Sequence, residues 1–217
     1  TGKVVLRATG STLYRVWLNG QFLAHGPARG PHGFYRVDEI DLTERLVPGT
    51  NLVAIEVAGY NANSYYLLDQ PSFLQAEIVA EGKVLAATGG EGAAFQAIPL
   101  KERLQKVQRF SFQRPFIEVY RLAPGGDDWR KLLAAPVPGV KCAVAESKAL
   151  LPRRVAYSDF ARRGATTLVG SGELTTGIQA AQPWKDRSLT QVGPALGGYL
   201  EKDLETVPSL ELQTIAT

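Results

Sequence analysis

Residues 13–60 have the sequence LYRVWLNGQFLAHGPARGPHGFYRVDEIDLTERLVPGTNLVAIEVAGY and contain the strongest local fold signal in the chain. Residues 13–18 alternate between two faces, with Tyr14, Val16 and Leu18 on one of them, which is the period of two of a half-buried strand. Asn19-Gly20 follows and supplies two residues that tolerate positive φ, so a type I′ hairpin is predicted. A one-residue slip would turn Val16 and Leu18 to water, so this turn also fixes the register.

The rest of this stretch alternates short strands with turns. Strands are predicted at 21–24, 34–40 and 52–58, because apolar residues recur there between turn formers. Asp41 or Thr43 is expected to bond nearby backbone N–H groups, and Gly49 to take a conformation that a side chain would oppose. Further strands are predicted at 3–9, 73–80, 84–88, 95–100 and 109–122. The pattern predicts an all-β protein built as a β-sandwich.

Two motif-bearing strings in this stretch, WLNGQFLAHGP and IDLTERLVPGTNLVAIEV, carry a family resemblance. With their NG hairpin, D-L-T turn and G-x-N strand, they resemble the jelly-roll accessory domain, of galactose-binding-like fold, that precedes the catalytic domain in several glycoside hydrolase families. The bacterial α-L-rhamnosidases are the most similar of these families, and the sugar-binding domain of β-galactosidase-type enzymes comes next. The resemblance is specific over about residues 5–80 and looser to about residue 122.

The predicted domain organisation follows from this resemblance and from a change of texture after residue 122. Residues 1–122 are expected to form the jelly-roll β-sandwich accessory domain. Residues 123–152 include PGGDDW and AAPVPGV, which are typical of a linker. Residues 153–217 are expected to be part of a smaller β-rich connecting region at the C-terminal side.

Composition narrows the classes of function. The 24 basic residues exceed the 21 acidic residues by only three, so charge does not indicate a nucleic-acid partner. No apolar run reaches transmembrane length, so membrane insertion is not expected. Cys142 is the single cysteine and cannot form an internal disulfide. The chain starts with Thr1 and contains no methionine, which predicts a fragment of a longer protein. As a separate expectation, a periplasmic or extracellular location is favoured over a cytoplasmic one.

A catalytic site is not predicted in this chain. Glycoside hydrolysis needs two carboxylates that flank one bond. The adjacent pairs Asp38-Glu39 and Asp127-Asp128 should diverge in an extended chain, and both are expected at exposed turns or strand edges. His25 and His32 lack further ligands at a fixed spacing, so neither a metal nor a cofactor is expected.

Carbohydrate contact is the remaining chemistry. Sugar sites combine aromatic platforms with polar side chains, presented on loops at one end of a rigid scaffold. Trp17 faces away from Val16 and Leu18, so it is either an exposed platform or is buried against the following domain. The loop residues that fit a sugar site are His25, Arg29, His32, Asn61, Asn63, Tyr65, Tyr66 and Asp69.

Two functions from different classes are therefore weighed. The resemblance implies a non-catalytic carbohydrate-binding or scaffold fragment of an α-L-rhamnosidase-type hydrolase. Its partners would be a carbohydrate, such as a rhamnose-containing glycan, and the catalytic domain of the same chain. Inverting hydrolysis of a terminal α-L-rhamnoside would then use two carboxylates in a helical barrel outside this sequence. The alternative is a stand-alone lectin-like or adhesin-like β-sandwich interaction protein.

Overall fold

The computed structural model describes residues 2–60, 63, 67–90, 93–103, 118, 120, 124–131, 139–161, 163, 164, 166 and 167. These residues form an all-β structure with two short 3-10 turns, and no α-helix occurs among them. The strands are β1 (Val4–Ser11), β2 (Leu13–Leu18), β3 (Gln21–Gly26), β4 (Phe34–Asp41), β5 (Val53–Ala58), β6 (Phe73–Ala80), β7 (Lys83–Ala87) and β8 (Ala149–Pro152). The 3-10 turns are η1 (Thr43–Arg45) and η2 (Asp128–Arg130).

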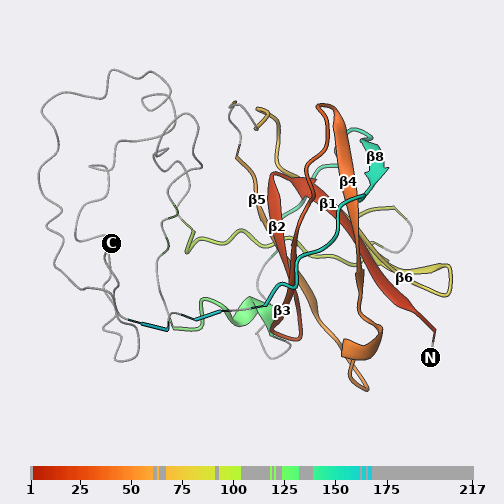
Figure 1. Ribbon diagram of the computed structural model, residues 1–217, viewed down its shortest axis with the longest axis vertical. Helices are drawn as coiled ribbons and strands as arrows, with labels where there is room; N and C mark the ends of the chain where they lie inside the picture. Colours follow the sequence, from red (N-terminus) through yellow and green to blue (C-terminus); the bar gives the residue numbers. More distant parts are fainter. Residues whose placement is uncertain are drawn as a thin grey trace, which may run out of the picture. The chain divides into compact units, whose positions relative to one another are not determined.

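The strands form two sheets that pack as layers (Figure 1). One sheet has five strands in the order β7-β6-β1-β4-β8, and the other has three in the order β3-β2-β5. Leu6 and Ala8 of β1 face Val16 and Leu18 of β2, and all four side chains are buried. The apolar alternation that predicted strands therefore buries one face of each sheet. This arrangement confirms the predicted β-sandwich.

The predicted hairpin between β2 and β3 is confirmed. Asn19 has φ 51° and Gly20 has φ 82°, as a type I′ turn requires. The side chain of Asn19 also reaches beyond its own turn: its Nδ2 donates to Asn51 Oδ1 at 2.9 Å, and its Oδ1 accepts from Leu52 N at 2.8 Å. Asn51 in turn donates to the carbonyl of Gly49 at 3.2 Å. The NG and G-x-N motifs are thus two halves of one polar contact that holds the start of β5 beside the β2–β3 turn.

Replacing Gly20 with valine tests this turn. A β-branched side chain at φ 82° is strained, so we expect Gly20→Val to lower the free energy of unfolding by roughly 1–3 kcal/mol. Thermal unfolding followed by circular dichroism measures the change. Gly89→Ala is the matched control, because a Cβ at Gly89 meets no atom within 4 Å. An unchanged melting temperature for Gly20→Val would contradict the assigned turn.

The D-L-T turn after β4 also forms as predicted. Asp41 Oδ1 accepts from the backbone N of Thr43 at 2.9 Å and from its hydroxyl at 2.6 Å. These hydrogen bonds hold the pKa of the Asp41 carboxyl below its usual range, with the Thr43 hydroxyl as the largest cause. Val4 N donates to the same Thr43 hydroxyl at 3.0 Å, so the turn is joined to the first strand of the sheet.

The structure divides the chain into two compact units. One compact unit contains residues 1–99 and 127–160, and the other contains residues 100–126 and 161–217. The predicted linker 123–152 includes β8, which pairs in parallel with β4 through Phe34 to Val37. Residues 149–152 therefore pair with the edge strand of the five-stranded sheet. We call residues 149–160 the strap.

The remaining predicted strands have mixed outcomes. The hairpin at residues 73–88 is confirmed as β6 and β7, with Glu81 and Gly82 both at positive φ. At 95–100 the chain makes only an isolated bridge, between Ala97 and Val140. Most of 109–122 and most of 153–217 lie outside the described residues. In the second unit, Tyr120 forms a bridge with Arg103, whose guanidinium lies 4.7 Å from the tyrosine ring centroid.

Candidate functional site

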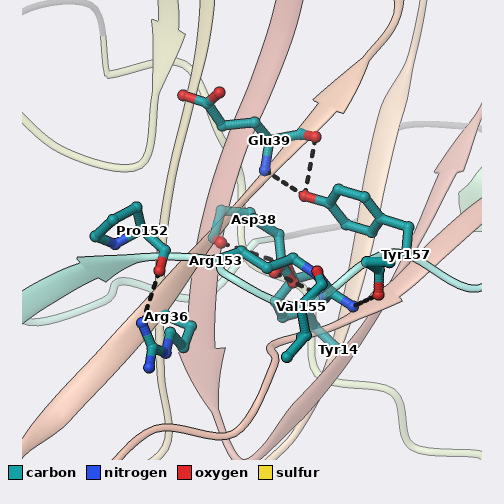
Figure 2. Close-up of polar contacts among 10 residues, drawn as sticks. Tyr14, Arg36, Asp38, Glu39, Pro152, Arg153, Val155 and Tyr157 are labelled. Carbon is teal, nitrogen blue, oxygen red and sulfur yellow. Dashed lines mark hydrogen bonds and ion pairs between the residues drawn. The ribbon is translucent and has the colours of Figure 1, made fainter.

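A carboxylate lies between the two sheets. Asp38 is on the inner face of β4 and is only 1% exposed. Tyr14, on the inner face of β2, donates its hydroxyl to Asp38 Oδ2 at 2.5 Å. This hydrogen bond joins the two sheets through the core, and both residues are labelled in Figure 2.

The other oxygen of Asp38 is bound by the strap. Arg153 Nη1 donates to Asp38 Oδ1 at 3.0 Å, and the arginine side chain is 14% exposed. The same guanidinium donates to the carbonyls of Val155 at 2.8 Å and Ala156 at 3.0 Å. It also lies 4.1 Å from the ring centroid of Tyr157. The guanidinium is therefore fixed on several sides, as a buried ion pair requires.

The strap also covers the free edge of β4. The Tyr157 hydroxyl accepts from the backbone N of Glu39 at 2.7 Å and donates to the carbonyl of Glu39 at 2.9 Å (Figure 2). Arg153 N donates to the carbonyl of Val37 at 3.2 Å. These contacts continue the edge pairing that β8 begins. The strap thereby satisfies backbone groups that an open strand edge would leave unpaired.

The Tyr14–Asp38–Arg153 cluster has a structural role and not a catalytic one. Burial raises the pKa of Tyr14 above its ordinary value, and the Asp38 carboxylate adds to that rise, so the phenol keeps its proton and donates it. Both oxygens of Asp38 are already bound, so neither is free to take a proton from a substrate. The prediction that Asp38 and Glu39 diverge is confirmed, since Glu39 pairs with Arg7 at 2.9 Å. The expected exposure of Asp38 was wrong, because the residue points inward.

The other adjacent acidic pair lies at η2. Asp127 and Asp128 are exposed, as predicted. Asp127 forms an ion pair with Arg130, and Lys131 Nζ lies 2.9 Å from Asp128 Oδ1. The two carboxylates thus pair with cations of the same short turn.

The outer face of the three-stranded sheet is covered by aromatic residues from later in the chain. Trp17 is 5% exposed and packs edge-on against Phe22 and Trp129, with centroids 6.0 and 5.3 Å away. The guanidinium of Arg130 lies 5.0 Å from the Trp17 ring. Trp17 is therefore not an exposed platform. It is buried by η2, which belongs to the same compact unit.

The first group of predicted sugar contacts is exposed. His25 belongs to β3, where a loop was expected, and its ring lies 5.0 Å from that of Phe160. The pairing of His25 with Arg15 places it on the outer face of the three-stranded sheet. Arg29 and His32 lie between β3 and β4 and are exposed.

The second group is only partly described. Asn63 and Asp69 are exposed and in contact, since Asp69 N donates to Asn63 Oδ1 at 2.9 Å. Asn61, Tyr65 and Tyr66 lie outside the described residues. A contact between this asparagine and aspartate is typical of a local loop turn, so it does not test a role in sugar binding.

The ends of the two predicted loops lie side by side. The Tyr35 hydroxyl is hydrogen-bonded to Gln70 Oε1, and Gln70 Nε2 donates to Ser11 Oγ at 2.9 Å. Tyr35 follows Gly33 by two residues, and Gln70 directly follows Asp69. The ends of both loops therefore meet at one end of the sandwich. Binding of sugar by these loops stays a prediction.

Five residues that the C-terminal half supplies to the sandwich were not predicted from the sequence: Trp129, Lys148, Arg153, Tyr157 and Phe160. Each of them contacts a residue more than 100 positions earlier in the chain. Local periodicity does not reveal such contacts. One signal was present. Asp38 falls on the inward side of the β4 alternation, and a carboxylate at an inward position requires a buried cation or donor. The sequence does not say which arginine supplies it.

No cluster of three or more His, Cys, Asp or Glu side chains within the described ranges has the arrangement of a metal site. No helix in the described part of the chain is long and apolar enough to cross a membrane.

Comparison with known proteins gave one informative match. No protein-family model matches the chain, and no curated protein matches it. The structure is similar to the crystal structure of a GH78 family rhamnosidase of Bacillus sp. GL1, with a TM-score of 0.59 and 27% sequence identity. The match covers 72% of this chain and 17% of that rhamnosidase. The likeness supports a relation to the rhamnosidase, and with it to a glycoside hydrolase domain.

Proposed function

We propose that this chain is the non-catalytic jelly-roll accessory module of an α-L-rhamnosidase-type glycoside hydrolase. The similarity to the GH78 family rhamnosidase, over 72% of this chain and 17% of that one, is the observation that carries the proposal. Catalysis in the parent enzyme would reside in a separate domain, with terminal α-L-rhamnosides as substrates outside the cytoplasm. The same relation disfavours a stand-alone adhesin.

The described side chains support a scaffold role. Asp38, the one buried carboxylate among the described residues, is held by Tyr14 and Arg153 and cannot act as an acid or base. Glu39 and Glu77 pair with Arg7 on the outer face of the five-stranded sheet. A rigid sandwich with these fixed pairs is suited to packing beside a catalytic domain and to presenting loops.

The isolated chain is expected to leave an aryl α-L-rhamnoside intact, because both oxygens of Asp38 are bound within the core and Glu39 and Glu77 are both paired with Arg7. Release of the aryl group measured by absorbance tests this expectation. Turnover above background that disappears when a single Asp or Glu of this chain is replaced would contradict the proposal. A sample whose turnover survives every such replacement contains a contaminating enzyme.

We further propose that the loops at one end of the sandwich contact the glycan. The described residues of this set are His25, Arg29, His32, Asn63 and Asp69, and Asn61, Tyr65 and Tyr66 complete it. Titration of the ¹⁵N-labelled chain with L-rhamnose should shift amide signals at 25–32 and 61–69, with a dissociation constant on the order of millimolar. An absence of shifts, or shifts confined to residues beyond 122, would leave the module as a scaffold alone.

A further inference from the structure

A second polar and aromatic cluster lies on the outer face of the five-stranded sheet. Tyr35 of β4 and Phe73 of β6 pack edge to face with centroids 4.9 Å apart. The ammonium of Lys148 lies 5.2 Å from the Phe73 ring and 5.9 Å from the Tyr35 ring. All three side chains are half-buried. We call these residues the Lys148 cluster.

The register of the sheet shows that the cluster is a continuous patch. Phe73 pairs with Ser11 of β1, and Tyr35 pairs with Leu150 of β8. Lys148 precedes Leu150 by two residues, so an extended chain puts both side chains on one face. Leu150 is exposed. The patch therefore spans four strands at the end of the sandwich where the two predicted sugar loops end.

In the described part of the chain, the charge of Lys148 is not matched by a carboxylate. Among the described residues, no Asp or Glu oxygen lies within ion-pair distance of its ammonium, although Arg7, Arg15 and Arg153 all have such partners. The two aromatic rings hold the ammonium by their quadrupoles, which is a weaker interaction than a charge-assisted hydrogen bond. An anion that reaches Lys148 would therefore gain a contact that the protein itself does not supply.

Neutral hydrogen-bonding groups border the same patch. The Gln70 amide joins Tyr35 to Ser11. The hydroxyl of Thr9, two residues before Ser11 on the same face, is buried and is the one such side-chain atom without a hydrogen-bond partner in the described part of the chain. An orphan hydroxyl on the same face of the sheet as the cluster indicates a place where a water molecule or a ligand group completes the bonding.

We infer that the Lys148 cluster binds a carboxylated sugar, that is, a uronic acid residue of a glycan. The carboxylate would pair with Lys148, the apolar C–H face of the pyranose would lie on Tyr35 and Phe73, and hydroxyls would bond to Gln70 and the groups beside it. A simple anion would use only the lysine, and a neutral sugar only the rings and the amide. The combination favours a ligand with both features.

This site is distinct from the His25–Asp69 loop contacts and does not depend on the parent being a rhamnosidase. It predicts that the glycan recognised here contains acidic residues. Titration of the ¹⁵N-labelled 217-residue chain with D-glucuronate, D-glucose and acetate at constant ionic strength tests it. We expect saturable shifts of the Tyr35, Gln70 and Phe73 amides with D-glucuronate on the order of millimolar, and at least about tenfold weaker binding of the other two.

Three variants distinguish a specific role of Lys148 in binding from a nonspecific effect of positive charge. Lys148→Gln should weaken D-glucuronate binding by roughly tenfold, Lys148→Arg should retain it within about threefold, and Lys141→Gln, at an exposed lysine of the same segment, should leave it unchanged. The spectra of the unliganded variants report whether each is folded. The inference is overturned by no shifts at about 50 mM, by equal binding of D-glucose or acetate, or by an unaffected Lys148→Gln. L-rhamnose shifts at 25–32 and 61–69 bear only on the loop proposal.

Discussion

Replacing Arg153 with methionine is expected to lower the free energy of unfolding by about 3–5 kcal/mol, because it leaves the buried Asp38 carboxylate without its cation. For a compact unit of this size, the melting temperature should fall by roughly 6–20 °C. Methionine fills a similar volume, so the loss reports the charge and its hydrogen bonds. Thermal and urea unfolding, followed by circular dichroism, measure the change.

Two comparisons make this test specific to the Asp38–Arg153 pair. Arg154→Met removes the same charge from the neighbouring, exposed position and should change stability by no more than about 0.5 kcal/mol. The double variant Asp38→Asn/Arg153→Met no longer has an unpaired buried charge, so it should be more stable than Arg153→Met alone. Equal stability of Arg153→Met and Arg154→Met would show that the strap does not bind the core in this way.

Gly26→Ala is the second substitution with a large expected effect. A Cβ at Gly26 would lie 2.6 Å from the Tyr14 hydroxyl and closer still to Asp38 Oδ2, where no side-chain carbon fits. Overpacking in a core costs about 1–3 kcal/mol. Here the displaced atoms are also the hydrogen-bonded pair that joins the two sheets, so we expect a loss of about 3 kcal/mol or more.

The control for Gly26→Ala is Gly89→Ala, where the added methyl group meets no atom within 4 Å. That variant should unfold within about 0.5 kcal/mol of the wild type. Tyr14→Phe provides a second comparison, since it removes the hydroxyl that the new methyl group would strike. If Gly26→Ala unfolds like the wild type, the close packing of Gly26 against Tyr14 and Asp38 is incorrect.

The part of the fold that depends on local patterns was predictable. The apolar alternation in residues 13–18 predicts a strand, and the pairs Asn19-Gly20 and Glu81-Gly82, both at positive φ, predict hairpin turns. Each of these signals acts between residues that are close in the sequence. The strap was not predictable in the same way. β8 is four residues long and ends in Pro152, and it pairs with a strand more than 100 residues earlier.

Only the residue types of the candidate site and their place on loops could be predicted from the sequence. Polar and aromatic loop residues at one end of a sandwich follow from composition, and the Tyr35–Gln70 hydrogen bond shows that the ends of the two loops meet. Position on a strand does not reveal which later segment covers it. The sequence therefore allowed Trp17 to be either an exposed platform or a buried side chain. In the structure it is buried under Trp129 and Arg130. Lys148 carried no sequence signal, because its partners are rings on two other strands.

The most direct measurement is the hydrolysis of an aryl α-L-rhamnoside by the product of the full open reading frame that encodes this chain, compared with the 217-residue chain alone. We expect turnover by the full product and none above background by the isolated chain. It also predicts that no single Asp or Glu replacement within these 217 residues abolishes the activity of a full product that remains folded. A full product without α-L-rhamnosidase activity, or one whose chemistry depends on a carboxylate of this chain, would contradict it.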